Sequence, residues 1–549
     1  MSDVVPWPPE YAARYRAAGL WRDRPLGYWM WQWADGYGDR VALVDGEVRL
    51  TYRQLAERAD SMAEALHGWE LHPGDRVLVQ LPNSWEFVVV VLACFRAGLA
   101  PVMALPAHRS HELEHLARTA SARALLVPDV LREFDHQSLA AQVASKQDGP
   151  CRVFVLGSEI RPGHVDLRRL AEVVGDPVER RLRLDALEPA ADDVALFLLS
   201  GGTTGVPKMI ARTHNDYDYN FRRSAEVCEF GPDTVYLVTL PMAHNFPLAC
   251  PGVLGSLANG GRVVLLRSPE PVAAFAVIAA EGVTVTAVVP AIAKRWVESA
   301  GRSAPDLSSL RLLQVGGSVL DPVLAREVPA VLGAQLQQVF GMAEGLLNYT
   351  RPGDPDAVRF ATQGRPICAH DEVRIVDGDD RAVPPGEIGE LLTRGPYTPR
   401  GYYRSDEHNA RSFTADGWYR TGDLVRMHRS GNLVVEGRLK DLVNRGGEKV
   451  SAEEIEILAR KLLPVLDAVV VPVADEVFGE RVCLVVVSRA EQELGIDHVR
   501  EVFAEHGIAH YKIPELLRSV AELPLTAVGK VDKKAVREAL SVSMARSDS

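Results

Sequence analysis

The sequence predicts an α/β protein with a large N-terminal domain of parallel strands and helices, followed by a smaller α+β domain. Two observations support this prediction: fully apolar strand-like runs through most of the chain, and a change to alternating patterns after about residue 370. Strands that are apolar along their whole length are typical of parallel sheets covered by helices on both faces. Strands that alternate apolar and polar residues are typical of antiparallel sheets with one face in water.

The apolar runs recur at intervals that leave room for a helix between successive strands. We expect buried strands at residues 77–81, 101–105, 153–156, 194–199, 263–266 and 285–289. The segments 372–376 and 432–436 alternate and are flanked by glycine-containing turns, so we expect them in an antiparallel sheet.

A charged, glycine-bearing stretch, Gly437-Arg438-Leu439-Lys440-Asp441, separates the alternating strands from a last segment of mixed pattern. Such a stretch between two patterned regions indicates a domain boundary. We therefore expect two domains, residues 1–436 and residues 437–549. A chain of 549 residues is long enough for each of them to bury a core of its own.

The composition argues against several classes of protein. Acidic residues outnumber basic ones by 73 to 61, a net charge of −12, which disfavours nucleic-acid binding along a basic face. The longest apolar run ends at Arg96, well short of the ~18 residues that a membrane span needs, and the first residues lack the pattern of a secretory leader. The six cysteines are scattered without a C-x-x-C pair, as in reduced proteins. We expect a cytoplasmic protein with neither a nucleic-acid nor a membrane partner.

A segment rich in glycine and hydroxyl groups, Ser200-Gly201-Gly202-Thr203-Thr204-Gly205-Val206-Pro207-Lys208, directly follows the predicted strand 194–199. Its glycines allow backbone N–H groups to surround an anion, the hydroxyls add donors, and Lys208 adds a positive charge. It is not a Walker A loop, because the required Gly-Lys-Ser/Thr spacing does not occur. The segment therefore predicts phosphate binding; the alternative is a flexible surface turn.

Four further motifs follow along the chain: Gln338–Glu344 with an aromatic-Gly-x-x-Glu pattern, Tyr419–Asp423 (Y-R-T-G-D), the block 437–449, and Pro524–Lys530 (P-x-T-x-x-G-K). Together with residues 200–208, they resemble the adenylate-forming superfamily, which includes acyl-CoA synthetases, adenylation domains of peptide synthetases and beetle luciferases. The resemblance covers essentially the whole chain. It implies layered parallel sheets plus a distorted antiparallel barrel in the large domain, and a mobile C-terminal domain.

The resemblance also implies ATP and Mg²⁺, and a reaction in which a carboxylate attacks the α-phosphorus of ATP. Because two anions meet, fixed positive charge at the reacting centre is the main requirement. The superfamily pattern assigns this charge to Lys530, adds His244 as a catalytic residue, and assigns Mg²⁺ to Glu344 and Thr204, since oxygen ligands suit that ion. Outside such motifs these residues would more often belong to the surface or the core. The implied ATP- or AMP-binding residues are Ser200, Gly201, Gly202, Thr203, Thr204, Gly205, Lys208, Gly316, Gly317, Val339, Phe340, Gly341, Met342, Glu344, Asp423 and Arg438.

The same resemblance places a hinge at Lys440, about which the small domain would turn between an adenylating and a thioester-forming pose. In the second pose, Gly446 and Gly447 would line a tunnel for a pantetheine arm.

The segment Pro241–Gly252 narrows the acid that is activated. Amino-acid-activating relatives carry an Asp after the position of His244, where it pairs with the substrate ammonium; here the residue is Asn245. An ammonium buried without a carboxylate would cost several kcal/mol, whereas an amide suits a phenolic hydroxyl beside a carboxylate. This segment and residues 345–350 resemble stand-alone aryl acid adenylating enzymes of siderophore assembly. The implied substrate-binding residues are His244, Asn245, Phe246, Cys250, Gly317 and Leu347.

Within that group, Cys250 and Leu347 match enzymes that use salicylate, whereas users of 2,3-dihydroxybenzoate tend to carry Ser and Val. A thiol is a weak partner for a 3-hydroxyl, and Leu occupies the space that this group would need. We therefore expect salicylate as the preferred substrate and a phosphopantetheinylated aryl carrier protein as acceptor. A 2,3-dihydroxybenzoate-AMP ligase and an aryl-CoA ligase remain alternatives.

Two unrelated interpretations have less support. His111–His115 matches the H-E-x-x-H zinc pattern, but Leu113 and Leu116 would form the buried stripe of that helix, so we expect both histidines to face solvent. A catalytically inactive binding protein is disfavoured because the motif residues expected for catalysis are all present.

Overall fold

The computed structural model describes residues 3–200, 206–439, 442–462, 465–488, 494–524 and 531–545. These residues fall into two compact units. Unit 1 holds residues up to 106, 116–200 and 208–437, and unit 2 holds 107–115, 206–207 and the described residues from 438 onward. The expected domain ranges, with the roles attached to them, stay a prediction.

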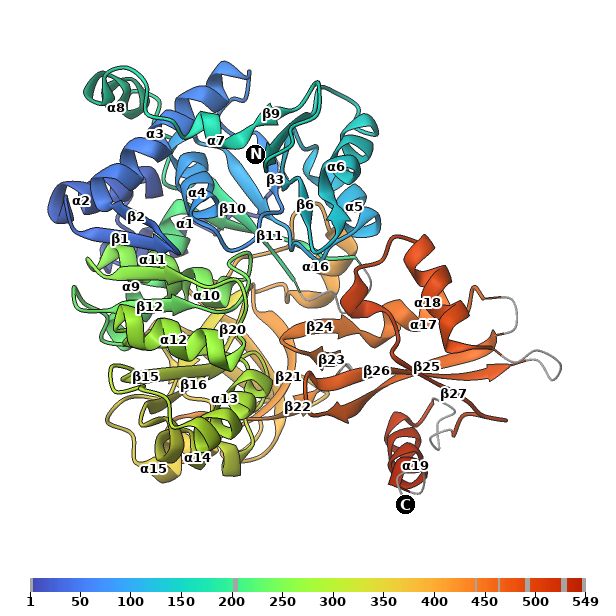
Figure 1. Cartoon of the computed structure of the whole chain (residues 1–549). Helices are drawn as coiled ribbons and strands as arrows, with labels where there is room; N and C mark the ends of the chain where they lie inside the picture. Colours follow the sequence, from blue (N-terminus) through green and yellow to red (C-terminus); the bar gives the residue numbers. More distant parts are fainter. Residues whose placement is uncertain are drawn as a thin grey trace. The chain divides into compact units, whose positions relative to one another are not determined.

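A nine-stranded sheet forms the first layer of unit 1 (Figure 1). Its inner strands are parallel, and antiparallel strands lie at both ends. The strand order is β18 (Arg365–Pro366), β17 (Gly345–Tyr349), β16 (Gln335–Met342), β15 (Leu312–Gly316), β14 (Val285–Val288), β12 (Val235–Val238), β13 (Arg262–Leu265), β1 (Val41–Asp45) and β2 (Val48–Thr51).

Helices cover both faces of this sheet because its strands are apolar on both sides. In β12, the side chains of Tyr236 and Val238 join one core, and Leu237 between them joins the other, as expected for the two-residue repeat of a strand. The helices around the sheet are α9 (His214–Val227), α10 (Asn245–Ala249), α11 (Gly252–Ala258), α12 (Pro271–Glu281), α13 (Pro290–Ser303), α14 (Pro322–Leu332) and α15 (Asp356–Ala361).

A seven-stranded sheet forms the second layer, with the order β11 (Met209–Thr213), β10 (Val194–Leu199), β4 (Ala100–Met103), β3 (Arg76–Val79), β5 (Ala124–Pro128), β8 (Arg152–Leu156) and β9 (Val165–Asp166). The expected apolar strands are therefore confirmed, although β10 pairs antiparallel with β11 on one side and parallel with β4 on the other. The remaining elements before residue 200 are α1 (Pro9–Ala17), α2 (Leu26–Tyr37), α3 (Tyr52–Gly68), α4 (Trp85–Ala97), α5 (Ser110–Ala120), β6 (Val130–Leu131), β7 (Phe134–Asp135), α6 (His136–Ser145), α7 (Leu167–Leu170) and α8 (Pro177–Asp185).

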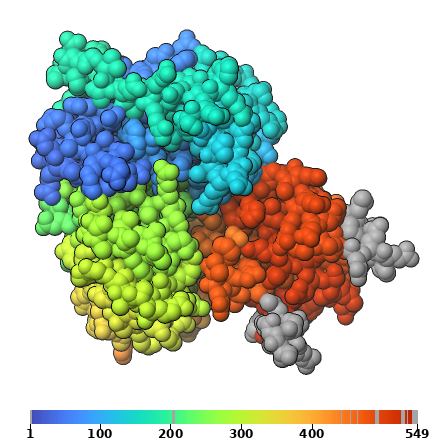
Figure 2. Space-filling view, viewed as in Figure 1, coloured from blue at the N-terminus to red at the C-terminus, as the bar shows by residue number. Residues whose placement is uncertain are grey.

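The part of unit 1 that was expected to form a distorted barrel contains a four-stranded antiparallel sheet, β19 (Glu372–Val376), β20 (Gly389–Arg394), β21 (Tyr419–Met427) and β22 (Leu433–Arg438), with α16 (Asp406–Ser412) beside it. In Figure 2, the early residues of unit 1 (blue to teal) and its middle residues (green to yellow) occupy separate regions of the surface.

Unit 2 is built on an antiparallel sheet with one parallel neighbour, β27. Apolar residues of its strands and helices form two small cores. Its elements are β23 (Leu442–Arg445), β24 (Glu448–Ser451), α17 (Ala452–Ala459), β25 (Val465–Asp475), β26 (Gly479–Ser488), α18 (Ile496–Glu505), a 3₁₀ turn (His510–Lys512), β27 (Leu516–Ser519) and α19 (Lys533–Ala545).

Candidate functional site

Two predicted substrate-binding residues, His244 and Asn245, and the predicted nucleotide-binding residue Gly316 lie at one edge of the nine-stranded sheet. β12, β15 and β16 run parallel in that sheet, so their carboxyl ends meet at the same edge. The segment after β12 carries His244 and Asn245, and Gly316 ends β15. Ligands of open α/β sheets bind at this edge. The fold therefore places these residues where a binding site is expected.

Asn83 holds the segment between β12 and α10 in place. Its side-chain amide donates to the carbonyl of Leu240 at 2.9 Å, and its Oδ1 accepts from the N–H of Met242 at 2.9 Å. The chain then enters α10, with His244 as the N-cap residue in extended conformation. This route fixes the position at which the helix presents Asn245.

Asn245 is 8% exposed, and its two polar atoms differ in how they are satisfied. The hydroxyl of Tyr217 donates to Oδ1 at 3.0 Å, whereas Nδ2 is buried with no hydrogen-bond partner among the described residues. Burial raises the pKa of Tyr217 well above its usual range, so the hydroxyl stays neutral and donates. The amide is thereby oriented with a free donor, and a buried donor of this kind calls for an acceptor on a ligand.

Two glycines bring the walls of this region close together. A Cβ on Gly316 would lie 2.7 Å from the carbonyl oxygen of Val339 and 3.2 Å from the Phe246 ring. A Cβ on Gly341 would lie 2.4 Å from Cδ2 of Leu347. Gly316 therefore has no room for a larger residue, because the close atom belongs to the backbone, whereas a larger residue at Gly341 would displace the Leu347 side chain.

Cys250 and Leu347 are both almost fully buried in the same core cluster. Burial raises the pKa of the Cys250 thiol to about 12, against a smaller opposing effect of the Arg212 charge. The thiol is therefore neutral at physiological pH. Arg212 itself is fully buried, pairs with Asp216 at 2.6 Å and donates to the carbonyl of Ala343 at 3.1 Å.

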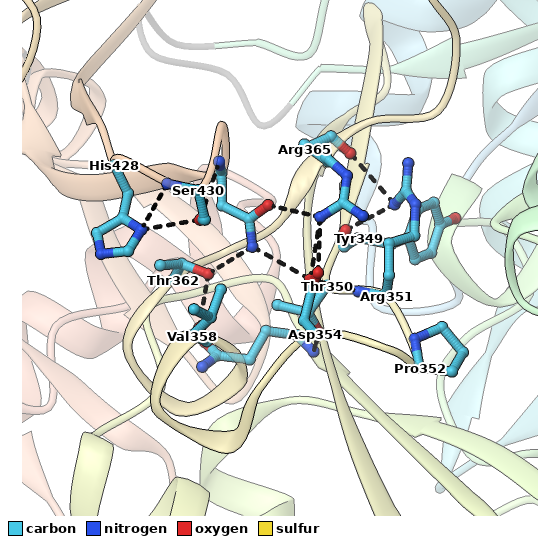
Figure 3. A network of polar contacts seen from close by, with 12 residues as sticks. Tyr349, Thr350, Arg351, Pro352, Asp354, Val358, Thr362, Arg365, His428 and Ser430 are labelled. Atoms are coloured by element: carbon cyan, nitrogen blue, oxygen red, sulfur yellow. Dashed lines mark hydrogen bonds and ion pairs between the residues drawn. The ribbon is translucent and has the colours of Figure 1, made fainter.

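The far end of β17, beyond Leu347, is anchored by two arginines (Figure 3). Arg351 donates to the carbonyls of Tyr349 at 2.6 Å and Pro366 at 2.7 Å. Arg365 pairs with Asp354 at 2.8 Å and also donates to Asn432 at 2.9 Å. These bonds tie the strand to its neighbour β18 and to the β21–β22 connection.

Two of the residues predicted to hold phosphate and metal, Lys208 and Glu344, lie beside Tyr402. The N–H of Ser200 donates to the carbonyl of Lys208 at 3.0 Å. Nζ of Lys208 lies 4.9 Å from the centre of the Tyr402 ring, and the Tyr402 hydroxyl donates to Oε1 of Glu344 at 2.8 Å. The structure thus brings Lys208 and Glu344, far apart in sequence, to one aromatic side chain. Tyr402 also contacts the hydroxyl of Tyr419, at 3.1 Å, in the strand that carries Asp423.

Further predicted residues lie in β21, in β22 and in the turn between β23 and β24, or outside the described ranges. Asp423 is buried in β21, where its N–H donates to Thr421. Arg438 is the last residue of β22 and the first residue of this part of unit 2. Gly446 and Gly447 form the left-handed turn between β23 and β24. The residues that lie outside the described ranges are Gly201, Gly202, Thr203, Thr204, Gly205, Lys440 and Lys530.

For the H-E-x-x-H segment, the expected burial of Leu113 and Leu116 is confirmed, whereas the expectation that both histidines face solvent was wrong. His111 and His115 are partly buried, and Glu112 between them is completely buried. The Glu112 carboxylate accepts the N–H of Arg109 at 2.9 Å and pairs with Lys512 at 3.1 Å, so the helix can bury it. Across the described ranges, no group of three or more His, Cys, Asp or Glu side chains is arranged to hold a metal ion.

Sequence reasoning missed Tyr217, Tyr402 and Arg212. Tyr217 and Tyr402 act through contacts that are distant in sequence, and Arg212 joins its neighbour Asp216 to the distant carbonyl of Ala343, so no motif of the sequence contains them. One signal was available: the segment 214–220, His-Asn-Asp-Tyr-Asp-Tyr-Asn, is unusually polar for a helix that is almost wholly buried.

No helix in the described part of the chain is long and apolar enough to cross a membrane.

An α/β sheet with a buried, oriented amide at the carboxyl ends of its parallel strands has the arrangement of an enzyme that binds a small organic ligand. The AMP-binding enzyme family model matches residues 30–403, and the model of the AMP-binding enzyme C-terminal domain matches residues 454–530. The chain therefore belongs to the AMP-binding enzyme family, and the expected class, an ATP-dependent ligase of the adenylate-forming superfamily, is confirmed.

Close relatives are similar to this chain over almost its full length. A "salicylyl-CoA synthase / salicylate adenylyltransferase" of Streptomyces sp is 59% identical over 97% of each chain. A "2,3-dihydroxybenzoate-AMP ligase" of Bacillus subtilis is 48% identical over 98% of each. A "salicyl-AMP ligase / salicyl-S-ArCP synthetase" of Mycobacterium tuberculosis is 45% identical over 99% of this chain and 95% of its own. Among solved structures, Mycobacterium smegmatis MbtA without ligand matches with a TM-score of 0.75 and 44% identity, over 98% of this chain and 99% of that one.

Proposed function

We propose that this protein activates salicylate: the carboxylate attacks the α-phosphorus of ATP, salicyl-AMP forms and pyrophosphate leaves. The acyl group then passes to the phosphopantetheine thiol of an aryl carrier protein, with AMP as leaving group, in siderophore or related nonribosomal peptide biosynthesis. The names of the Streptomyces and Mycobacterium tuberculosis relatives support this substrate, and the second also names a carrier-bound product.

The observation that carries the proposal is the buried amide of Asn245. Its Oδ1 accepts a hydrogen bond from the Tyr217 hydroxyl, and its Nδ2 has no acceptor among the described residues. The oxygen of the 2-hydroxyl of salicylate supplies that acceptor. An α-ammonium group, which can only donate, would find no carboxylate at this position, so α-amino acids are rejected.

Cys250 and Leu347 favour salicylate over 2,3-dihydroxybenzoate. A neutral, buried thiol is a poor partner for a 3-hydroxyl, and the Leu347 side chain packs closely against Gly341. Leaving a hydroxyl buried without a partner costs ~1–3 kcal/mol. Because apolar pockets reject an added hydroxyl by at most ~10²-fold, dihydroxybenzoate is a slower substrate and not an excluded one.

ATP is held, in this proposal, by residues 200–208 and by the ends of β15, β16 and β21, with Asp423 and Arg438 at the ribose. Glu344 fits a Mg²⁺ ligand because the Tyr402 bond to Oε1 orients its carboxylate, and Thr204 would complete the metal contact. When bound, Mg²⁺ neutralises phosphate charge. Lys530 supplies positive charge at the reacting phosphorus, and His244 lies beside the acid.

The two domains have separate roles in this proposal. Residues 1–436 bind ATP and the aryl acid, and residues 437–549 carry Lys530. The smaller domain turns about Lys440 between the two half-reactions, and Gly446 and Gly447 then line the pantetheine tunnel.

A second candidate acceptor is coenzyme A, because the Streptomyces relative is named as a salicylyl-CoA synthase. The two acceptors share the first half-reaction and differ only in the thiol that attacks the acyl carbon. Incubating the enzyme with salicylate and ATP, and either coenzyme A or a phosphopantetheinylated aryl carrier protein, separates them by the thioester formed.

The first half-reaction is tested by ATP–pyrophosphate exchange with salicylate, 2,3-dihydroxybenzoate, benzoate and a set of α-amino acids. We expect the highest kcat/KM with salicylate, a lower value with dihydroxybenzoate and no exchange with amino acids. Exchange driven by an amino acid, or no exchange with any aryl acid, would overturn the proposal.

A further inference from the structure

Leu347 is held at its backbone as well as at its side chain. Its N–H donates to the hydroxyl of Tyr397 at 3.0 Å, and its carbonyl accepts from the N–H of Ile367 at 3.0 Å. The bond to a side-chain hydroxyl is unusual for a strand residue, whose N–H ordinarily bonds to the neighbouring strand. The position of this pocket wall therefore depends on a tyrosine 50 residues away in sequence.

The turn before Leu347 has a backbone that needs such support. Gly345 has φ +108°, and a Cβ there would lie 2.7 Å from the carbonyl oxygen of Tyr397. Leu346 has φ +42°, a left-handed conformation that costs a non-glycine residue of order 1 kcal/mol or more. The turn is thus packed directly against the backbone at Tyr397 and carries strain that the surrounding contacts must offset.

Tyr397 is itself fixed on both sides. Its hydroxyl donates to Oδ2 of Asp371 at 2.9 Å, and this oxygen also accepts from the N–H of Cys368 at 3.1 Å. The indole N–H of Trp21 donates to the carbonyl of Pro396 at 2.9 Å, next to Tyr397 in sequence. Tyr397 is completely buried, so its hydroxyl has one position available to it.

We infer that Tyr397 is a positioning residue that sets the width of the aryl pocket by holding the backbone of Leu347, with Asp371 orienting its hydroxyl. Tyr397 acts through Leu347 and does not itself select the acid. This inference rests on the proposed aryl acid activation. Tyr397, which lies outside every motif of the sequence, would thus join the residues that decide between salicylate and a 3-substituted acid.

The test is a double-mutant cycle of Tyr397→Phe and Leu347→Val, read as the ratio of kcat/KM for salicylate to that for 2,3-dihydroxybenzoate in ATP–pyrophosphate exchange. Tyr397→Phe leaves the Leu347 N–H without its acceptor, so we expect the ratio to fall by roughly 3- to 10-fold, the size of one hydrogen bond. In the Leu347→Val background the same change should have less than half that effect, because the residue it positions is already smaller.

Tyr52→Phe is the matched control, since it also removes a buried hydroxyl, one that donates to the carbonyl of Gly261 at 2.6 Å. It should lower the melting temperature without changing the substrate ratio. Asp371→Asn keeps a carbonyl oxygen for Tyr397 and should retain the wild-type ratio, whereas Asp371→Leu should lower it as Tyr397→Phe does.

An unchanged ratio in folded Tyr397→Phe, or equal effects of that change in both Leu347 backgrounds, would overturn the inference while leaving salicylate activation intact. If the wild type shows no exchange with any aryl acid, the proposed function fails first, so the two failures are distinguishable. If Tyr397→Phe does not fold, the substrate ratio of Asp371→Leu is compared with that of Asp371→Asn instead. Equal substrate ratios in these two variants would overturn the inference.

Discussion

Replacing Asn245 by alanine should remove the ability of the enzyme to distinguish salicylate from benzoate. In the wild type, benzoate offers no 2-hydroxyl, so Nδ2 of Asn245 stays buried without a partner. An unpaired buried donor costs ~1–3 kcal/mol. At 1.4 kcal/mol for each factor of ten, the kcat/KM for salicylate should exceed that for benzoate by ~5- to ~150-fold.

In Asn245→Ala no donor is left unpaired with benzoate, and the 2-hydroxyl of salicylate loses its partner, so the ratio should approach one through changes with both acids. Tyr217→Phe provides an intermediate case. It keeps Nδ2 but removes the 3.0 Å bond that holds Oδ1, so the amide can rotate and discrimination should fall only in part. Both variants are measured by ATP–pyrophosphate exchange with the two acids, alongside the KM for ATP, which should change little.

Two results would refute this reasoning. If the wild type uses benzoate as well as salicylate, the amide does not recognise the 2-hydroxyl. If Asn245→Ala retains the wild-type ratio while remaining folded, some other group provides the discrimination. Tyr52→Phe, which removes a buried hydroxyl elsewhere in unit 1, controls for a general loss of stability.

Three further predictions concern catalysis, specificity and stability. Lys530→Ala should abolish exchange while leaving ATP binding by calorimetry within about twofold, because the lysine acts in the transition state; exchange at the wild-type rate would contradict its role. Cys250→Ser should shift the kcat/KM ratio towards 2,3-dihydroxybenzoate by ~1 kcal/mol or more, and no shift would argue against the thiol facing the 3-position. Burial raises the pKa of Asp371 from 3.8 to about 7, and the hydrogen bond from Tyr397 and the charge of Arg223 oppose this shift only in part. The folded protein therefore binds a proton at Asp371 more tightly than the unfolded chain does. The resulting contribution to the free energy of unfolding is present at low pH and is lost as the pH rises through about 7. Asp371→Asn should therefore gain in melting temperature relative to the wild type between pH 5 and pH 8, and an equal pH dependence in both proteins would contradict this.

The fold was accessible from the sequence because its signals are local. Apolar runs such as 194–199 and 263–266 are strands in the structure, and 372–376 coincides with β19. The exception is the helix at 110–120, where the apolar pattern did not reveal that Glu112 is buried. Its carboxylate is compensated by Lys512, and a charge pair between residues so distant in sequence leaves no trace in helical periodicity.

The candidate site was accessible only in part, for the same reason. Asn245, Cys250 and Leu347 stand in recognisable segments, so the resemblance identified them. Tyr217 lies 28 residues from Asn245 in sequence. Its hydroxyl donates one hydrogen bond, as the hydroxyl of any buried tyrosine can, so the sequence does not distinguish Tyr217 from other tyrosines. Tyr397 bonds to a backbone N–H, which every non-proline residue has, so nothing in the sequence marks Leu347 as its partner.

The charge states of Tyr217, Cys250 and Arg212 bear on why the proposed reaction would need a lysine from a distant part of the chain. Tyr217 and Cys250 are neutral because burial raises the pKa of each. The buried charge of Arg212 is already matched by Asp216 at 2.6 Å and used in a bond to the carbonyl of Ala343. In the proposed function, these groups would recognise an uncharged ring and hydroxyl, but they would not neutralise a carboxylate that must approach a phosphate. Positive charge has to come from another part of the chain at the moment of reaction, and this is the requirement that Lys530 would meet.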